Sequence, residues 1–418
     1  MVKWDPPMAI HTSVRIGAGV RRLRGCFLGA LVAAIGAAAL VTACGEEAPP
    51  PLVPSPMPAP PPPLPPPPPP LPEPPPPKPV MADAQRKFLG DLEAALAARD
   101  AKKVAALYST GAVLVSAGKD GVHEAMGRAE IEASRARGFA VMGKAFPDLK
   151  WVNTRALQRG DVMVVEWVGT GTDTGGFLDD KPTSKKVGWR GVSIYWFDDD
   201  GLVKRETNVL DPMTIMGQLG RGDYKGKVRP AATAPSTPTQ WVTAKEVPEV
   251  QTNLEAVHAF YGLFEKKDDK ALAAMMTDDV VHTDLAQPDD VKGKEAVKKE
   301  LGAWFKAFPD VKMNATHAWA FGDIVVAEVE TTGTFKGPLG PLKPNGKTAT
   351  THSVDVIELS GGKIARVTSY TNAREFLLRY DLMPKPAAAP ATTTAAPPKK
   401  CPPPATCGSP TRARGARR

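Results

Sequence analysis

The sequence predicts two α+β domains of one design, arranged in tandem along the chain. The first observation is a duplication, because residues 144–171 and 306–333 align without a gap at a separation of 162 residues. The second is that each copy leaves a helix-like apolar pattern and then follows long alternating strands joined at Gly-Asp turns. Helices that precede a run of hairpin strands indicate a strongly curved, mainly antiparallel sheet wrapped around them.

The charge of the chain is concentrated at its two ends. The net charge is +8 over 418 residues. Residues 1–43 carry +4 and residues 385–418 carry +7, so residues 44–384 carry −3. The predicted folded part is therefore mildly acidic, which argues against a basic nucleic-acid-binding domain. We expect no nucleic-acid partner.

The N-terminal segment has the pattern of a secretion signal. A cluster of arginines precedes about sixteen apolar residues at 26–41, which is short for a membrane span but typical of a signal-peptide core. The following residues, LVTACG at 40–45, resemble a bacterial lipobox. That resemblance implies cleavage after residue 43, lipidation of Cys44 and, because Gly45 follows it, an outer-membrane protein facing the periplasm or the cell surface. An ordinary secretory signal or an uncleaved anchor is the alternative.

Two further segments are predicted to lie outside the domains. Residues 44–80 form a proline-rich spacer with 22 prolines in the 31 positions from 49 to 79. As a polyproline II helix this run would extend roughly 95 Å, although a PxxP ligand is an alternative use. Residues 385–418 are rich in Pro, Ala, Thr and basic residues and are predicted to be disordered. The four cysteines lie outside both domains, so neither domain holds a disulfide or a cysteine metal site.

The first domain is expected at residues 81–220. Apolar residues at helical spacing predict its helices, period-two alternation predicts its strands, and Pro147 ends the third helix. The predicted helices are 88–96, 104–108, 128–145 and 212–219, and the predicted strands are 112–116, 149–157, 162–172, 185–197 and 203–210.

The second domain is expected at residues 249–384, after a linker of Gly, Lys, Pro, Ala and Thr at 221–248. It repeats the order of the first domain. The predicted helices are 254–267, 271–276, 294–307 and one that begins at Asn372, and the predicted strands are 280–285, 311–320, 324–335, 347–359 and 364–371.

Short motifs recur at matching places in the two domains. They are Phe-Pro-Asp at 146–148 and 308–310, Gly-Asp at 160–161 and 322–323, Gly-Thr-Gly at 169–171 with Gly-Thr at 333–334, and a polar residue after the last strand at Asp211 and Asn372. On these motifs each domain resembles the SnoaL-like members of the NTF2-like cone fold, including the polyketide (ester) cyclases. The resemblance implies a pocket inside the cone, between the sheet and the helices. We expect no cofactor and no metal.

Asp211 has two interpretations. In SnoaL-like cyclases an aspartate near the end of the last strand acts as acid and base, and Asp211 falls at that position by resemblance. Burial in an apolar cone would raise the pKa of this carboxyl group. Asp211 also directly precedes Pro212, a typical N-cap followed by the favoured first helical residue. Asn372, with Glu375 three residues later, has the capping-box pattern in the second domain. Capping alone and capping with acid/base catalysis both remain open for Asp211.

Three polar residues of the second domain form another candidate site. His282 and Asp284 are two residues apart on one strand and therefore share a face. His352 lies on another strand, where its face-mates Val354 and Val356 indicate an inward orientation. His282 and Asp284 could serve acid/base chemistry, and with His352 they could bind substrate, hold a metal through two nitrogens and a carboxylate, or only line the pocket.

The long strands supply the candidates for ligand binding. Aromatic side chains would stack on a planar ligand, with core packing as the alternative. Two glutamates occupy matching places on matching strands and face either the pocket or solvent. The candidates for ligand binding are Glu166, Trp167, Trp189, Glu328, His352, Tyr370 and Asn372.

Two functional hypotheses follow. The first is an envelope lipoprotein that binds a small apolar or aromatic molecule in its cones, with acid/base activity of the cyclase or isomerase kind in the first domain. The second is a non-catalytic interaction or dimerisation module tethered to the outer membrane, in which sheet faces pair between the domains or between two copies of the chain. A titrating residue in an open pocket would favour the catalytic form of the first hypothesis.

Overall fold

The computed structural model describes residues 81–118, 121–221, 227–245 and 247–383. These residues belong to one compact unit of the chain. The predicted signal peptide, the lipidation site at Cys44, the proline spacer and the basic tail lie outside the described residues. Within the described ranges, every helix is too short or too polar to cross a membrane.

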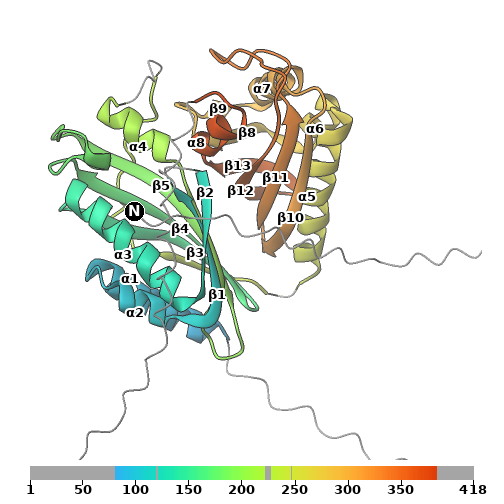
Figure 1. The fold of residues 1–418 in the computed structure, drawn as a ribbon. Helices are drawn as coiled ribbons and strands as arrows, with labels where there is room; N and C mark the ends of the chain where they lie inside the picture. The colour runs from blue at the N-terminus through green and yellow to red at the C-terminus, as the bar shows by residue number, and fades with distance from the viewer. Residues whose placement is uncertain (1–80, 119–120, 222–226, 246, 384–418) are drawn as a thin grey trace, which may run out of the picture. The chain divides into compact units, whose positions relative to one another are not determined.

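The first domain is a curved sheet of seven strands with helices on its inner side. Figure 1 shows α1 and α3 running along this sheet. The strand order is β2-β1-β6-β5-β4-β3-β7, with β1 parallel to β6 and β3 parallel to β7. The elements are α1 (Met81–Ala97), α2 (Ala101–Ala106), β1 (Tyr108–Gly118), β2 (Gly121–Met126), α3 (Gly127–Ala145), β3 (Lys150–Arg159), β4 (Val162–Thr172), η1 (Phe177–Asp179), β5 (Lys186–Phe197), β6 (Val203–Leu210), α4 (Pro212–Leu219) and β7 (Gln240–Thr243).

The second domain repeats this plan with six strands. Their order is β10-β11-β12-β13-β8-β9, and β13 runs parallel to β8. In Figure 1, α5 lies beside β10 and β11 of this sheet. The elements are α5 (Pro248–Lys266), α6 (Asp269–Ala274), β8 (Met276–Asp284), β9 (Val291–Lys292), α7 (Lys294–Ala307), β10 (Lys312–Phe321), β11 (Ile324–Thr334), β12 (Thr348–Ser360), β13 (Lys363–Thr371) and α8 (Ala373–Arg379).

The predicted fold class is confirmed, and three strands were not predicted. β2 and β9 are the return strands of hairpins with β1 and β8. β7 lies within the segment predicted as a linker, where Gln240–Thr243 pairs in parallel with β3. Part of the expected linker therefore belongs to the first sheet and covers its edge strand.

The repeated Phe-Pro-Asp motif ties the third helix of each domain to the sheet. Asp148 accepts hydrogen bonds from the backbone nitrogen and the hydroxyl of Thr172, both at 2.7 Å. Asp310 accepts the same pair from Thr334, at 2.8 and 2.5 Å. The aspartate thus fixes the turn after the helix to the end of a long strand, which explains why both residues occur in both copies.

Each sheet packs against other elements on both faces. We call the face that packs against the helices of the same domain the inner face, and the opposite face the outer face. Apolar residues on the inner side form two core clusters in each domain. The outer faces of the two sheets share a further cluster, so the domains pack sheet against sheet. Its buried members are Leu157, Val162, Val164, Val192, Ile194, Trp196, Leu285, Phe321, Val326, Val354, Val356 and Tyr370.

Polar contacts across this interface follow the internal repeat. Arg155 forms an ion pair with Glu358 at 2.7 Å. In the repeat, His317 corresponds to Arg155 and Trp196 corresponds to Glu358. The rings of His317 and Trp196 are also in contact, with their centroids 6.1 Å apart. The two domains therefore contact each other through equivalent places, as the subunits of a symmetric dimer do.

Candidate functional site

The residues predicted to form one site in the second domain lie on opposite faces of its sheet. Val280 of β8 and Ile357 of β12 belong to the inner core. His282 and Asp284 alternate with Val280 and share its inner face. His352 alternates with Val354 and Val356, which belong to the cluster between the domains. The prediction that His352 faces inward is therefore wrong, because its apolar face-mates pack against the other domain.

His352 is held on the outer face by two carboxylates. Its Nδ1 lies 2.8 Å from Oε1 of Glu375, and its Nε2 lies 3.8 Å from Glu330. The hydrogen bond with Glu375 raises the pKa of His352 above its ordinary value, against the opposing effect of burial. Glu375 thus contacts the imidazole, while Asn372 still accepts from the backbone nitrogen of Glu375 at 3.1 Å.

Three of the predicted ligand-binding residues also lie at the interface between the domains. The hydroxyl of Tyr370 donates to Oε1 of Glu166 at 2.5 Å, and Arg155 pairs with the other oxygen of Glu166. The matching Glu328 lies 3.0 Å from Nδ1 of His317. Both glutamates are nearly buried. The structure thus gives Glu166, Glu328 and Tyr370 partners within the chain.

Asp211 caps two helices, one in each domain. Its Oδ1 accepts from the backbone nitrogens of Met213 at 3.2 Å and of Ala373, the first residue of α8, at 3.1 Å. Its Oδ2 accepts from the backbone nitrogen and the hydroxyl of Thr214 at 2.9 and 2.8 Å. Burial raises the pKa of Asp211 to about 6, although these four donors act in the opposite direction. The predicted N-cap is confirmed, and both carboxylate oxygens are occupied.

The equivalent cap in the second domain is not symmetric with this one. The side-chain oxygen of Asn372 caps α8 by accepting from the backbone nitrogen of Glu375. The contact equivalent to that between Ala373 and Asp211 would be a hydrogen bond from the backbone nitrogen of Pro212 to Asn372. It cannot form, because proline has no backbone N–H. The side-chain nitrogen of Asn372 is buried without a hydrogen-bond partner among the described residues.

A cavity of about 250 Å³ lies beside Asp211 and residues 188–190 of β5. Arg190, Thr214 and Leu285 are among its lining residues, so both domains contribute. Arg229 also lines it, but its guanidinium is bound to the carbonyl oxygens of Gln287 and Asp284 and to the carboxylate of Asp290. The cavity thus lies at the joint between the domains, and Trp189 of the first domain also lines it.

Inside the first cone, two tryptophans occupy the place where a ligand was expected. Trp167 and Trp189 are 8% and 3% exposed. A Cβ added at Gly191 would stand 2.1 Å from Trp167, and one added at Gly169 would stand 2.5 Å from Trp189. Each indole therefore lies flat against the glycine opposite it in the sheet. These rings fill the first cone with the chain's own side chains.

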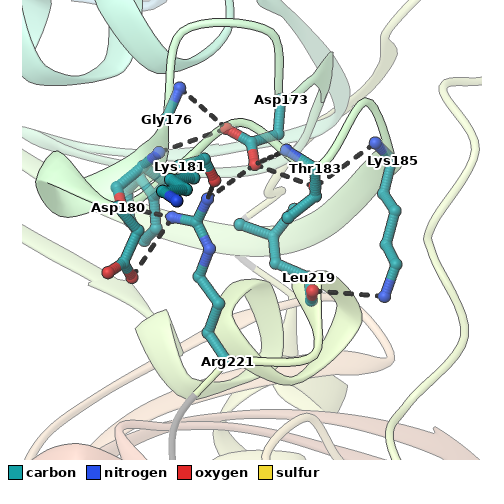
Figure 2. A network of polar contacts seen from close by, with 9 residues as sticks. Asp173, Gly176, Asp180, Lys181, Thr183, Lys185, Leu219 and Arg221 are labelled. Carbon is teal, nitrogen blue, oxygen red and sulfur yellow. Dashed lines mark hydrogen bonds and ion pairs between the residues drawn. The ribbon is translucent and has the colours of Figure 1, made fainter.

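A loop after β4 closes the same end of the first cone. Its Phe177 packs against Phe146 in the cluster that holds both tryptophans. Figure 2 shows how the fully buried Asp173 fixes this loop by accepting from the backbone nitrogens of Gly176 and Thr183 and from Arg221 at 2.8 Å. Arg221 also donates to the carbonyl oxygen of Lys181 at 2.5 Å. The loop is therefore fastened to the end of α4.

The second cone carries small polar residues at the corresponding places. The sheet register matches Trp167 and Gly191 with Val329 and Ser353. It matches Gly169 and Trp189 with Thr331 and Thr351. Ser353, Thr331 and Thr351 are half-buried on the inner face, whereas their counterparts in the first domain are buried. This end of the second inner face is therefore partly accessible and carries hydroxyl groups, whereas Val329 itself is 2% exposed.

His282 and Asp284 lie on this accessible inner face. Nδ1 of His282 lies 2.7 Å from Oε2 of Glu300 on α7, and its Nε2 lies 3.4 Å from the hydroxyl of Ser369. Burial lowers the pKa of His282, but the hydrogen bond and charge of Glu300 outweigh it, so the pKa is raised overall. Asp284 accepts from the hydroxyl of Thr371 at 2.5 Å. A carboxylate that orients an imidazole is the arrangement a general base requires.

Sequence reasoning missed Asp355, the most deeply buried polar residue of this face. It is 5% exposed and stands directly opposite Ser369 in the sheet. Its Oδ2 accepts from the hydroxyl of Tyr261 on α5 at 2.8 Å, whereas its Oδ1 is buried without a partner. Burial raises the pKa of Asp355 above its ordinary value. The signal in the sequence is a lone acidic residue between two apolar residues of a strand.

No group of three or more His, Cys, Asp or Glu side chains that could hold a metal ion occurs within the described ranges. His352 in particular is separated from His282 and Asp284 by the sheet.

Comparison with known proteins identifies both domains. Residues 254–377 match the family model of the SnoaL-like polyketide cyclases, and residues 90–206 match that of the SnoaL-like domain. None of the curated proteins matches the chain.

Several solved structures are similar to part of the chain. A SnoaL-like polyketide cyclase of Jannaschia sp. CCS1 has 20% identity and a TM-score of 0.30, covering 34% of this chain and 99% of its own. A polyketide cyclase of Xanthomonas campestris pv. campestris has 26% identity and a TM-score of 0.30, covering 32% and 98%. A protein of Catenulispora acidiphila with a ketosteroid isomerase-like fold has 19% identity and a TM-score of 0.28, covering 31% and 95%. From the two family matches and the repeated architecture, the chain contains two SnoaL-like domains in tandem, each with the NTF2-like α+β fold.

Proposed function

We propose that this chain is a lipid-anchored protein of the bacterial envelope whose second domain binds a small apolar or aromatic molecule on the inner face of its cone. The observation that carries the proposal is the contrast between the two inner faces. Trp167 and Trp189 fill the first cone, while the second has Val329 and Thr351 at the corresponding places. The first domain then serves mainly to cover the outer face of the second.

The acid/base activity predicted for Asp211 stays a prediction and is not part of this proposal. Asp211 accepts four hydrogen bonds at the joint between the domains. His282 and Asp355 lie instead on the inner face of the second cone, within reach of a ligand bound there.

The binding site is tested by filling the second cone as the first is filled. The double variant Val329→Trp/Ser353→Gly reproduces the pair formed by Trp167 and Gly191. We expect it to abolish binding of any small apolar or aromatic compound that a thermal-shift screen finds for the parent protein, because the new indole would occupy the inner face. Isothermal titration calorimetry measures the loss.

The control is Val141→Trp, the same substitution at a residue of α3 that is 42% exposed. It should leave binding unchanged. Undiminished binding by the filled variant, with its melting temperature preserved, would place the site elsewhere and contradict the proposal.

The lipid anchor rests on Cys44 and the residues before it. Cys44→Ser should leave an unprocessed precursor that takes up no labelled fatty acid in a bacterial host. Cys26→Ser, which removes the other cysteine of the same segment, should be processed and labelled like the parent. Normal cleavage and labelling of the Cys44→Ser protein would show that the anchor assignment is wrong.

A further inference from the structure

If the second cone is the ligand site as proposed above, the way in which the first domain holds its own Trp167 indicates what kind of ligand the second domain binds. The indole of Trp167 lies on Gly191, and its Nε1–H donates to the hydroxyl of Ser193 at 3.2 Å. Ser193 is 2% exposed and also accepts from the side-chain nitrogen of Asn208 at 2.7 Å. An aromatic ring with one N–H donor is thus held on the inner face by a buried acceptor.

The sheet register identifies the equivalent acceptor in the second domain. Ser193 stands opposite Val165 in the first sheet, and Asp355 stands opposite Ala327 in the second. Val165 and Ala327 are two residues before Trp167 and Val329, so Asp355 occupies the place of Ser193. The tryptophan that donates to this place in the first domain is replaced by a smaller side chain without a donor.

One oxygen of Asp355 accepts no hydrogen bond from the described residues. Its Oδ1 is buried and without a partner, whereas its Oδ2 is bound by Tyr261. The hydroxyl of Ser369 is also near enough to Asp355 to act against the rise of its pKa. A buried acceptor without a donor is unfavourable, and a ligand that supplies the donor removes that cost. The half-buried Ser353 and Thr351 lie farther along the same strand face.

We propose that the second cone takes a planar aromatic ligand with an N–H donor, which occupies the position of the Trp167 indole and donates to Asp355. The other titratable groups that act on this face are His282, Glu300 and Asp284. This face thus carries three carboxyl groups, those of Asp355, Asp284 and Glu300, and one imidazole. It therefore disfavours a ligand that carries a carboxylate of its own.

The test compares indole with 1-methylindole, which has the same ring system but no N–H. Calorimetry on the parent protein should give a dissociation constant for 1-methylindole about tenfold weaker, the effect of losing one hydrogen bond to a buried acceptor. This comparison needs no variant and therefore does not depend on how a substitution affects folding.

Two substitutions locate the acceptor. Asp355→Ser, which installs the residue of the first domain, should keep a preference for indole, and Asp355→Ala should abolish it. Equal affinities of the parent protein for indole and 1-methylindole would overturn the inference. The proposed function would still stand in that case if Val329→Trp/Ser353→Gly abolished the binding of both compounds. Failure of indole to bind would also overturn the inference, while the proposed function would be decided by the screen of other compounds.

Discussion

Replacing Arg135 by valine is expected to destabilise the first domain by about 3–5 kcal/mol, because it leaves the carboxylate of Glu206 buried without its partner. Glu206 is fully buried, and Arg135 pairs with it across the inner face. The hydroxyl of Tyr108 donates to the same carboxylate oxygen. Burial and then the charge of Glu206 raise the pKa of Tyr108 well above its ordinary value, so this hydroxyl remains a donor at neutral pH.

The second domain shows which combination should restore stability. β8 begins with Met276 where β1 begins with Tyr108. The repeat places Val297 at the position of Arg135. Val367 corresponds to Glu206, because Val203 and Ile364 pair with Tyr108 and Met276, and each of the two residues follows three positions later. Met276, Val297 and Val367 all belong to the apolar core of the second domain.

The triple variant Tyr108→Met/Arg135→Val/Glu206→Val should therefore be at least as stable as the parent, because apolar groups replace a buried ion pair without leaving a charge. Urea unfolding followed by circular dichroism measures both variants. A triple variant as unstable as Arg135→Val alone would mean that the two cores are not interchangeable at these positions.

Replacing Asp211 by asparagine is expected to stabilise the protein at pH 8, by at most about 3 kcal/mol, and to bring no gain at pH 3, below the ordinary pKa of the carboxyl group. The pKa of Asp211 is raised from 3.8 to about 6 by burial. The folded protein therefore holds this proton more tightly than the unfolded chain does. The stability that the proton provides is complete below about pH 3.8 and is lost as the pH rises through about 6. Asparagine carries no charge and keeps one oxygen that accepts from Thr214 at the cap of α4. Its amide nitrogen cannot accept from Met213 and Ala373, which reduces the gain.

Asp310→Asn serves as the control, because the pKa of Asp310 is shifted in the opposite direction and its substitution should change stability with the opposite sign. The hydrogen bonds from Thr334 lower the pKa of Asp310, so the stability that this carboxylate provides is present above its ordinary pKa and is lost in acid. Its substitution should cost stability at pH 8 and little at low pH. Denaturant unfolding at both pH values checks the pair. Destabilisation by Asp211→Asn at pH 8 would mean that the four donors to Asp211 outweigh its burial.

Much of the fold was predictable because local patterns and the duplication agree. The third helix and the long strands of each domain fall close to their predicted ranges, since Pro147 and Pro309 end the helices and Gly160 and Gly322 adopt the positive φ of the turns. The short β2 and β9 have too few residues for a periodic pattern. β7 was not predicted because its pairing with β3 is a long-range contact.

The site was less predictable because each sheet packs against other elements on both faces. Alternation separates two faces of a strand but does not say which one meets the helices. Val354 and Val356 therefore gave His352 the wrong face, and Asp355 lay unnoticed between them. Likewise, the sequence does not reveal that Trp167 packs on Gly191, since these residues are brought together only by the register of β4 and β5.

The most direct test of the account is a crystal structure of the protein soaked with indole. We expect the indole ring on the inner face of the second domain, over Ser353, with its nitrogen about 2.8–3.2 Å from Oδ1 of Asp355. Indole found in the cavity beside Asp211, or in the first cone in place of Trp167, would contradict the assignment of the second cone as the ligand site.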